Sequence, residues 1–165
     1  MIDRRTAFLL PVVLGSMAIP ALGQGKAAPL EASEGWEVLP TAHSFPVLVA
    51  RLDDAVKANK MAAVTAASAS DGAKAQGFTI PGNRVVGVFR NDFARRMLAA
   101  SVPAGIEAPI RFYLTENSDG TATLSYRKPS TVFAPYFNRA TSDLKSLAAE
   151  LDAIFGRIAT DAVGK

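Results

Sequence analysis

The sequence has no cysteine and only one histidine, His43. The lack of cysteine excludes disulfides, thiol catalysis, iron–sulfur clusters and thiolate zinc sites. A catalytic zinc site would have to complete its ligands with carboxylates alone, which is an unusual set. A Ser–His pair would have to use His43, and the chain contains no Gly-x-Ser-x-Gly turn. The sequence therefore predicts no catalytic residue, no metal site and no cofactor.

Charge is also scarce. Only 20% of the residues are charged, and the formal net charge is +3. Nucleic-acid-binding proteins concentrate many more Lys and Arg residues on one face, so we expect no nucleic-acid partner. Because 49% of the 165 residues are hydrophobic, core packing is sufficient to stabilise one ordinary globular domain.

The N-terminal segment predicts export. Arg4 and Arg5 precede an apolar stretch over residues 7–19, and residues 21–23 offer the small-x-small pattern of a cleavage site. The apolar stretch is shorter than the ~20 residues of a membrane-spanning helix. We interpret residues 1–23 as a cleaved signal peptide, which predicts a periplasmic protein without a stable membrane anchor. The paired arginines are compatible with the general secretory route and with the twin-arginine route.

The remaining chain predicts a flexible tether over residues 24–35 and a single α+β domain over residues 36–165. Helices are indicated by apolar residues at helical spacing after a capping residue, and strands by alternation or by short apolar runs. The first elements predicted in this way are a strand over 36–39, a helix over 45–59 capped by Ser44, a buried strand over 61–67 and a short helix over 70–76.

The second half of the domain carries clearer patterns. Residues 84–90 have an uninterrupted apolar centre, which predicts a central strand buried on both faces. The elements predicted after it are a helix capped by Asn91 or Asp92 and ending near Ser101, a β-hairpin over 110–127 with its turn at Gly120, a loop over 129–140 and a final helix capped by Thr141 or Ser142.

The final helix carries one apolar stripe, which indicates that it packs along the sheet. The stripe consists of Leu144, Leu147, Ala148, Leu151, Ile154, Phe155 and Ile158. Together these elements predict a compact α+β domain with a mixed sheet, a central apolar strand, a C-terminal β-hairpin and a long C-terminal amphipathic helix.

The order of four stretches resembles the bacterial domain-of-unknown-function 302 family. The resemblance extends from about Ser44 to Val163, and no one motif carries it. The stretches are 52–57 (LDDAVK), 85–92 (VVGVFRND), 108–112 (APIRF) and 119–129, which begins with Asp-Gly and ends with Tyr-Arg-Lys-Pro. The resemblance implies a compact α+β subunit that forms a homodimer, and it implies no established activity.

The strand-to-helix junction at Arg90, Asn91 and Asp92 is a candidate ligand site. The free N–H groups at the start of a helix can hold an anion, and Arg90 stands beside them. The competing interpretation is that Asn91 or Asp92 caps the helix. Arg111 and Arg127 project from the polar face of the hairpin, which allows a basic surface, although exposed arginines are more often solvated or paired. Arg111 and Tyr126 complete the candidate set.

Three aromatic residues, Phe133, Tyr136 and Phe137, crowd into the segment before the final helix. They would leave an apolar patch on a soluble monomer unless something covers them. Three roles remain open: covering the domain's own core, forming a dimer contact, or acting as a lid over a ligand cleft.

The leading hypothesis is a non-enzymatic exported homodimer that binds a small ligand or a partner protein. The basic and aromatic candidates favour an anionic or amphiphilic small molecule as that ligand. The alternative is an enzyme of unknown reaction that uses Arg, Tyr and carboxylate residues around the Arg90 turn, for example Tyr126 with Arg111.

Overall fold

The structure, a computed structural model, describes residues 30–164, so the predicted signal peptide and most of the predicted tether lie outside the described residues. The strands are β1 (Trp36–Pro40), β2 (Ala62–Ala67), β3 (Asn83–Phe89), β4 (Ile110–Glu116) and β5 (Ala122–Arg127). The helices are α1 (Phe45–Ala58), α2 (Ala69–Ala75), α3 (Asn91–Ala100), α4 (Pro129–Phe133) and α5 (Asp143–Val163). Two short 3₁₀ helices, η1 (Pro103–Glu107) and η2 (Ala134–Arg139), follow α3 and α4.

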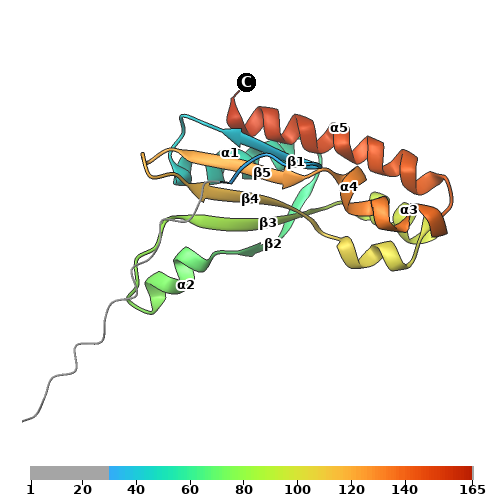
Figure 1. Ribbon diagram of the computed structural model, residues 1–165, viewed down its shortest axis with the longest axis horizontal. Coiled ribbons are helices and arrows are strands. Elements are labelled where there is room, and N and C mark those ends of the chain that lie inside the picture. Colours follow the sequence, from blue (N-terminus) through green and yellow to red (C-terminus); the bar gives the residue numbers. More distant parts are fainter. Residues whose placement is uncertain (1–29, 165) are drawn as a thin grey trace, which may run out of the picture.

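The five strands form one sheet in the order β1-β5-β4-β3-β2, and each neighbouring pair is antiparallel (Figure 1). The predicted α+β domain and its hairpin are confirmed, whereas the predicted mixed sheet is wrong in this detail. A parallel pair would need a crossover between its strands, and here each pair of neighbours runs in opposite directions. Gly120 occupies the hairpin turn with φ of +83°, as predicted.

One face of the sheet carries the hydrophobic core. Successive strand residues point to opposite faces, so the register places Val86, Phe112 and Tyr126 in one row on the same face. The α5 stripe packs on this face, and all seven of its predicted residues are buried. Figure 1 shows α5 running along the length of the sheet, and α1 contacts both α5 and the strands β4 and β5.

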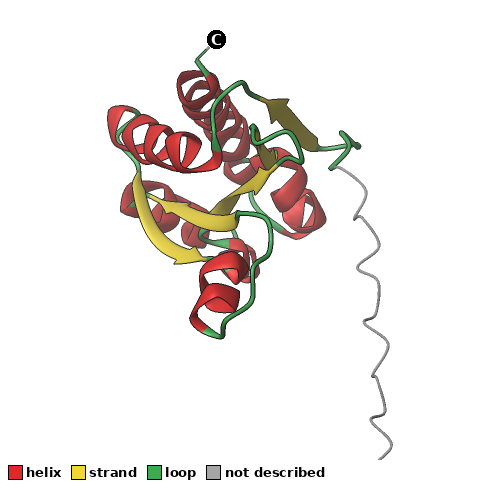
Figure 2. Cartoon of the chain, turned by 90° about the vertical axis from the view of Figure 1, so that its left-hand side faces the viewer, coloured by secondary structure: helices red, strands yellow, loops and turns green. Residues whose placement is uncertain are grey.

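The opposite face of the sheet is not covered by the core helices. Its nearest helix is α2, which Figure 2 shows near the viewer and below the strands, apart from the other helices. The element packed beside α2 is β3. Within residues 30–164, no helix is both long and apolar enough to cross a membrane.

Of two predictions about strand burial, one is corrected and one is confirmed. The segment over 61–67 was expected to be buried, but β2 is an edge strand that is exposed along its whole length. Its alanines are small enough for a buried or an exposed strand, so the composition of this segment does not indicate which of the two it is. The prediction that residues 84–90 form a central strand is confirmed, because β3 lies inside the sheet between β4 and β2. Three consecutive residues at the middle of β3, Val86, Gly87 and Val88, are buried, as expected of a strand covered on both faces.

Three predictions about local elements are also corrected. Arg90 occupies the N-cap position of α3, so Asn91 and Asp92 lie within the first turn and do not cap it. The segment over 129–140 is α4 followed by η2 and is not a loop. Ser44 and Ser142 occupy the N-cap positions of α1 and α5, but neither side chain makes a capping hydrogen bond.

Candidate functional site

The strand register shows which residues lie on the open face of the sheet, the face opposite the core. One cross-strand row contains Trp36 opposite Arg127 on β1 and β5, and Arg111 opposite Gly87 on β4 and β3. The next row runs through Val38, Ser125, Tyr113, Val85 and Ala67. Because Phe112 and Tyr126 face the core, their neighbours Arg111 and Arg127 must face the other way.

This open face is hollowed into a depression with a volume of about 760 Å³. Trp36, Tyr113 and Val85 supply aromatic and apolar lining, and Arg111 and Arg127 supply positive charge. The start of α2, Glu107 at the end of η1 and Val132 of α4 also line the depression. A volume of this size falls in the range of ordinary small-molecule sites, which also combine apolar walls with a few polar groups.

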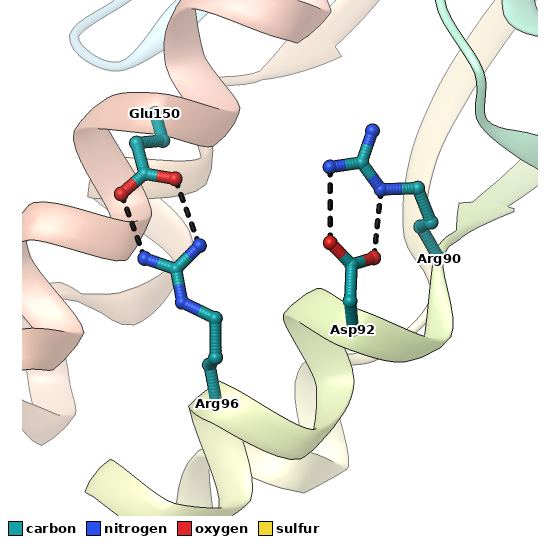
Figure 3. A network of polar contacts seen from close by, with 4 residues as sticks. All are labelled: Arg90, Asp92, Arg96 and Glu150. Atoms are coloured by element: carbon teal, nitrogen blue, oxygen red, sulfur yellow. Dashed lines mark hydrogen bonds and ion pairs between the residues drawn. The ribbon is translucent and has the colours of Figure 1, made fainter.

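The predicted site at the β3–α3 junction is a closed ion-pair corner (Figure 3). Arg90 donates from Nε to Oδ1 of Asp92 at 2.7 Å and from Nη2 to Oδ2 at 3.1 Å. Its guanidinium also lies 4.4 Å from the ring centroid of Phe93. Because a carboxylate of the same chain already occupies the fork of Arg90, this corner offers an incoming anion little.

A second bidentate pair joins this corner to the C-terminal helix. Arg96 donates from Nη1 and Nη2 to the two carboxylate oxygens of Glu150 at 2.8 and 2.7 Å (Figure 3). The hydrogen bond from Arg90 and its positive charge lower the pKa of Asp92. The hydrogen bond from Arg96 lowers the pKa of Glu150 in the same way. The network therefore connects α3 to α5 and has a structural role.

The pocket beneath Arg90 is too small for a metabolite. It is lined almost wholly by core residues such as Phe93, Met97 and Phe155, and its volume is about 30 Å³. This is about the volume of one water molecule, and the lining provides few polar groups to bind one. The junction that sequence reasoning favoured therefore lacks a ligand cavity.

Tyr126 and Arg111 are not brought together. Tyr126 faces the core, only 5% exposed, with its ring centroid 5.1 Å from that of Phe112. Burial raises the pKa of Tyr126 to about 12, with a smaller contribution from the negative charges of Glu37 and Asp152. Both residues line the depression on the sheet, but the Tyr126 hydroxyl lies near Gly156 of α5, on the core side. Arg111 projects to the opposite face, so the functional groups that the enzyme alternative paired do not meet.

The aromatic segment divides between core and surface. Phe133 is 1% exposed and belongs to the core, which leaves it no surface for a partner or a ligand. Tyr136 and Phe137 are half-buried against that core. The Tyr136 hydroxyl donates to Oε1 of Glu107 at 2.7 Å, so the segment is tied to η1.

His43 lies near Gly164 and Arg51, at the C-terminal end of α5. Across residues 30–164, no three His, Asp or Glu side chains are arranged to hold a metal ion.

Comparison with known proteins identifies the family. The family model described as "Domain of unknown function DUF302" matches residues 37–159. The chain belongs to the DUF302 family. The match covers the whole sheet except Trp36, together with most of α5.

The fold of this DUF302 domain also occurs in a solved structure. It is similar to the crystal structure of an uncharacterised conserved DUF302 protein from Bacillus stearothermophilus, with a TM-score of 0.69 and 14% sequence identity. The similarity covers 79% of this chain and 99% of that chain. At this identity the likeness establishes the fold alone. A search of the curated proteins found no match.

The sequence of this DUF302 domain placed Arg111 and Arg127 on the polar face of the hairpin but did not bring Trp36 to them. Trp36 was placed on a strand, yet the pairing of β1 with β5 was not predicted. The available signal was the alternation within the hairpin, which already placed Arg111 and Arg127 on the face opposite the apolar residues.

Proposed function

We propose that this protein is a non-enzymatic, exported DUF302 module that binds an anionic or amphiphilic small molecule and acts as a homodimer. The observation that carries the proposal is the depression of about 760 Å³ on the open sheet face. It combines a tryptophan, a tyrosine and two arginines in one concave surface, which is the chemistry of a small-molecule site.

Ligand binding is tested on the purified protein with a panel of metabolites and by mass spectrometry of whatever co-purifies. A ligand of the depression is expected to raise the melting temperature, because it binds the folded state only. Tyr113→Ala, which removes the aromatic lining at the middle of β4, is expected to abolish the shift. If Tyr113→Ala leaves the shift intact, the ligand binds elsewhere and the depression is not the site.

The dimer proposal is supported by an apolar patch on the α3–η1 corner. Leu98, Val102 and Ile106 are 46%, 73% and 80% exposed, which is costly for a monomer in water. Glu107, which follows Ile106 in η1, accepts a hydrogen bond from the Tyr136 hydroxyl. We therefore place the dimer contact on this corner and leave the depression accessible.

Analytical ultracentrifugation tests this assembly. The wild type is expected to sediment as a dimer at tens of micromolar, and the double variant Val102→Glu with Ile106→Glu is expected to be a monomer. Val47→Glu introduces the same charge at a residue of α1 that is 46% exposed, so it serves as the matched control. A strictly monomeric wild type would remove the dimer from the proposal.

Export is tested separately by cell fractionation and N-terminal sequencing of the protein in its native host. We expect a periplasmic protein whose first residue is Gln24, after loss of residues 1–23. A cytoplasmic protein that retains Met1 would overturn the location and leave the binding proposal to its own test.

A further inference from the structure

Two arginines face each other on the open side of the sheet. The pairing of β4 with β5 ends at Phe112 and Tyr126, and the same register extended by one residue puts Arg111 opposite Arg127. Directly opposed residues on antiparallel strands have Cβ atoms about 5 Å apart. The two guanidinium groups therefore start from neighbouring positions on one face, and both side chains are exposed in the depression.

Neither arginine is neutralised by the described part of the chain. The ion pairs within residues 30–164 use Lys57, Arg90, Arg96 and Lys128, and none involves Arg111 or Arg127. Like charges directly opposite each other destabilise a sheet, so the pair is unfavourable for the fold alone. An anion bound between them would relieve this repulsion.

One carboxylate, that of Glu107, lines the same depression. Its Oε1 accepts the hydrogen bond from Tyr136, and it forms no ion pair with either arginine. Glu107 therefore opposes an anionic ligand weakly and does not replace one. Removing the negative charge of Glu107 should therefore strengthen the binding of an anion in the depression.

Aromatic rings flank the arginine pair. Trp36 is the register partner of Arg127, and Tyr113 lies two residues beyond Arg111 on the same face of β4. Guanidinium groups bind planar carboxylates and phosphates through paired hydrogen bonds, and aromatic rings present flat apolar surface to a ligand body. The depression thus has a charged part and an aromatic part next to each other.

We propose that Arg111 and Arg127 form an oxyanion clamp for a small molecule that carries a carboxylate or phosphate group on a flat apolar body. The oxyanion lies between the two guanidinium groups, and the body lies against Trp36 and Tyr113. This inference rests on the proposed binding function and specifies the ligand chemistry of the same depression.

The test uses the fluorescence of Trp36, the only tryptophan in the chain, during titration with defined probes. Benzoate and phenyl phosphate supply the two oxyanions on a ring, benzamide supplies the ring without charge, and inorganic phosphate supplies the anion without a ring. We expect saturable changes in emission with benzoate or phenyl phosphate, and binding at least about tenfold weaker for benzamide and for inorganic phosphate.

The variants Arg111→Gln and Arg127→Gln are each expected to weaken binding of the charged aromatic probes by about tenfold or more. Because each substitution removes a like-charge contact, the free variants are expected to unfold at the same urea concentration as the wild type or higher. Glu107→Gln removes the opposing charge and is expected to bind as tightly as the wild type or more tightly. Arg95→Gln removes an exposed arginine outside the depression and is the matched control.

The outcomes separate this inference from the proposed function. If benzoate and benzamide bind equally to the wild type and to Arg111→Gln, the clamp is overturned while a small-ligand site on the sheet remains. If inorganic phosphate binds as tightly as phenyl phosphate, the aromatic part of the inference is overturned. If no probe, charged or neutral, changes the emission of Trp36, the clamp and the proposed site both fail.

Discussion

The rings of Phe112 and Phe155 stack with their centroids 4.8 Å apart and their planes 12° from parallel. Phe112 lies at the centre of the sheet on β4, and Phe155 lies in the apolar stripe of α5. The ring of Tyr126 packs against both. This contact fixes the long C-terminal helix to the middle strand, and it is made by some of the largest fully buried side chains of the domain.

Phe155→Ala is expected to lower the free energy of unfolding by about 3–5 kcal/mol, because it leaves a cavity between helix and sheet. Urea denaturation followed by circular dichroism measures this loss. Phe78→Ala is the control, since Phe78 is 65% exposed and its truncation should change stability by no more than about 0.5 kcal/mol. Equal losses in the two variants would show that the stacked pair does not anchor α5.

Arg51 connects α1 to the C-terminal end of α5. It donates from Nε to the carbonyl of Ala162 at 2.6 Å and from Nη2 to the carbonyl of Asp161 at 2.8 Å. The last carbonyls of a helix lack partners within the helix, and a cation there is favoured by the helix dipole.

Arg51→Met is therefore expected to lower the free energy of unfolding by about 1–2 kcal/mol, measured by urea denaturation. Arg95→Met, a change of the same kind at an exposed position of α3, should have an effect within about 0.5 kcal/mol. If the two variants unfold at the same urea concentration, the contact of Arg51 with α5 contributes no stability.

Periodic elements were predictable from sequence. The stripe of α5 and the alternation of the hairpin have clear periods, and both were placed on the correct buried face. Elements without a period were not predictable in the same way. The alanines of β2 suit a buried or an exposed strand, and the strand order alone decides which environment they have.

The candidate site was predictable only in part, because its residues come from strands far apart in the chain. Arg111 and Arg127 were placed together on the polar face of the hairpin, but Trp36 joins them only because β1 pairs with β5. Arg90 looked like an anion site because its local sequence does not show that Asp92 folds back onto it. Local sequence indicates where charges are, whereas the long-range register determines which of them remain unpaired.

Gly87 is required by a close approach on the open face of β3. A Cβ atom at this position would overlap Oγ1 of Thr65 and come within 2.7 Å of Cγ of Pro109. Gly87→Ala is expected to lower the free energy of unfolding by about 1–3 kcal/mol, because backbone or neighbouring side chains must shift.

Gly72→Ala provides the opposite control. Gly72 lies within α2, and a Cβ atom there would meet no atom within 4 Å. Alanine should stabilise this helix by about 0.5–1 kcal/mol relative to glycine. Thermal denaturation of both variants is expected to move the melting temperature in opposite directions, and a shift of the same sign in both would contradict the packing described for Gly87.

The ion pairs at the α3–α5 corner predict how stability responds to acid. The pKa of Asp92 lies below its ordinary 3.8, and that of Glu150 lies below its ordinary 4.5. As pH falls, the unfolded chain takes up protons first, so the contribution of these pairs is complete above about pH 5 and is lost below it.

The double variant Asp92→Asn with Glu150→Gln is therefore expected to show a smaller loss of stability between pH 7 and pH 3 than the wild type. Urea denaturation at the two pH values measures this difference. Asp53→Asn with Asp71→Asn removes two carboxylates outside the network and controls for the same change in net charge. An acid-induced loss in the double variant equal to that of the wild type would mean that the corner does not contribute to acid sensitivity.

Tyr126 predicts the response to alkali. Burial raises the pKa of this phenol from its ordinary 10.0 to about 12 in the folded state. Below pH 10 the phenol is neutral in both states, and between about pH 10 and pH 12 the unfolded chain ionises while the folded chain resists. A group whose folded pKa is raised contributes its stability at low pH and loses it as pH rises, so unfolding becomes easier in this interval.

Tyr126→Phe removes the buried phenol and keeps the ring that packs against Phe112 and Phe155. Its loss of stability between pH 9 and pH 11.5, measured by urea denaturation, is expected to be smaller than that of the wild type. In an alkaline titration followed at 295 nm, the variant should also lack the absorbance increase of the phenol that ionises last in the wild type. Tyr113→Phe, on the open face of the sheet, is the control. If this control flattens the alkaline loss as much as Tyr126→Phe does, burial of Tyr126 is not its cause.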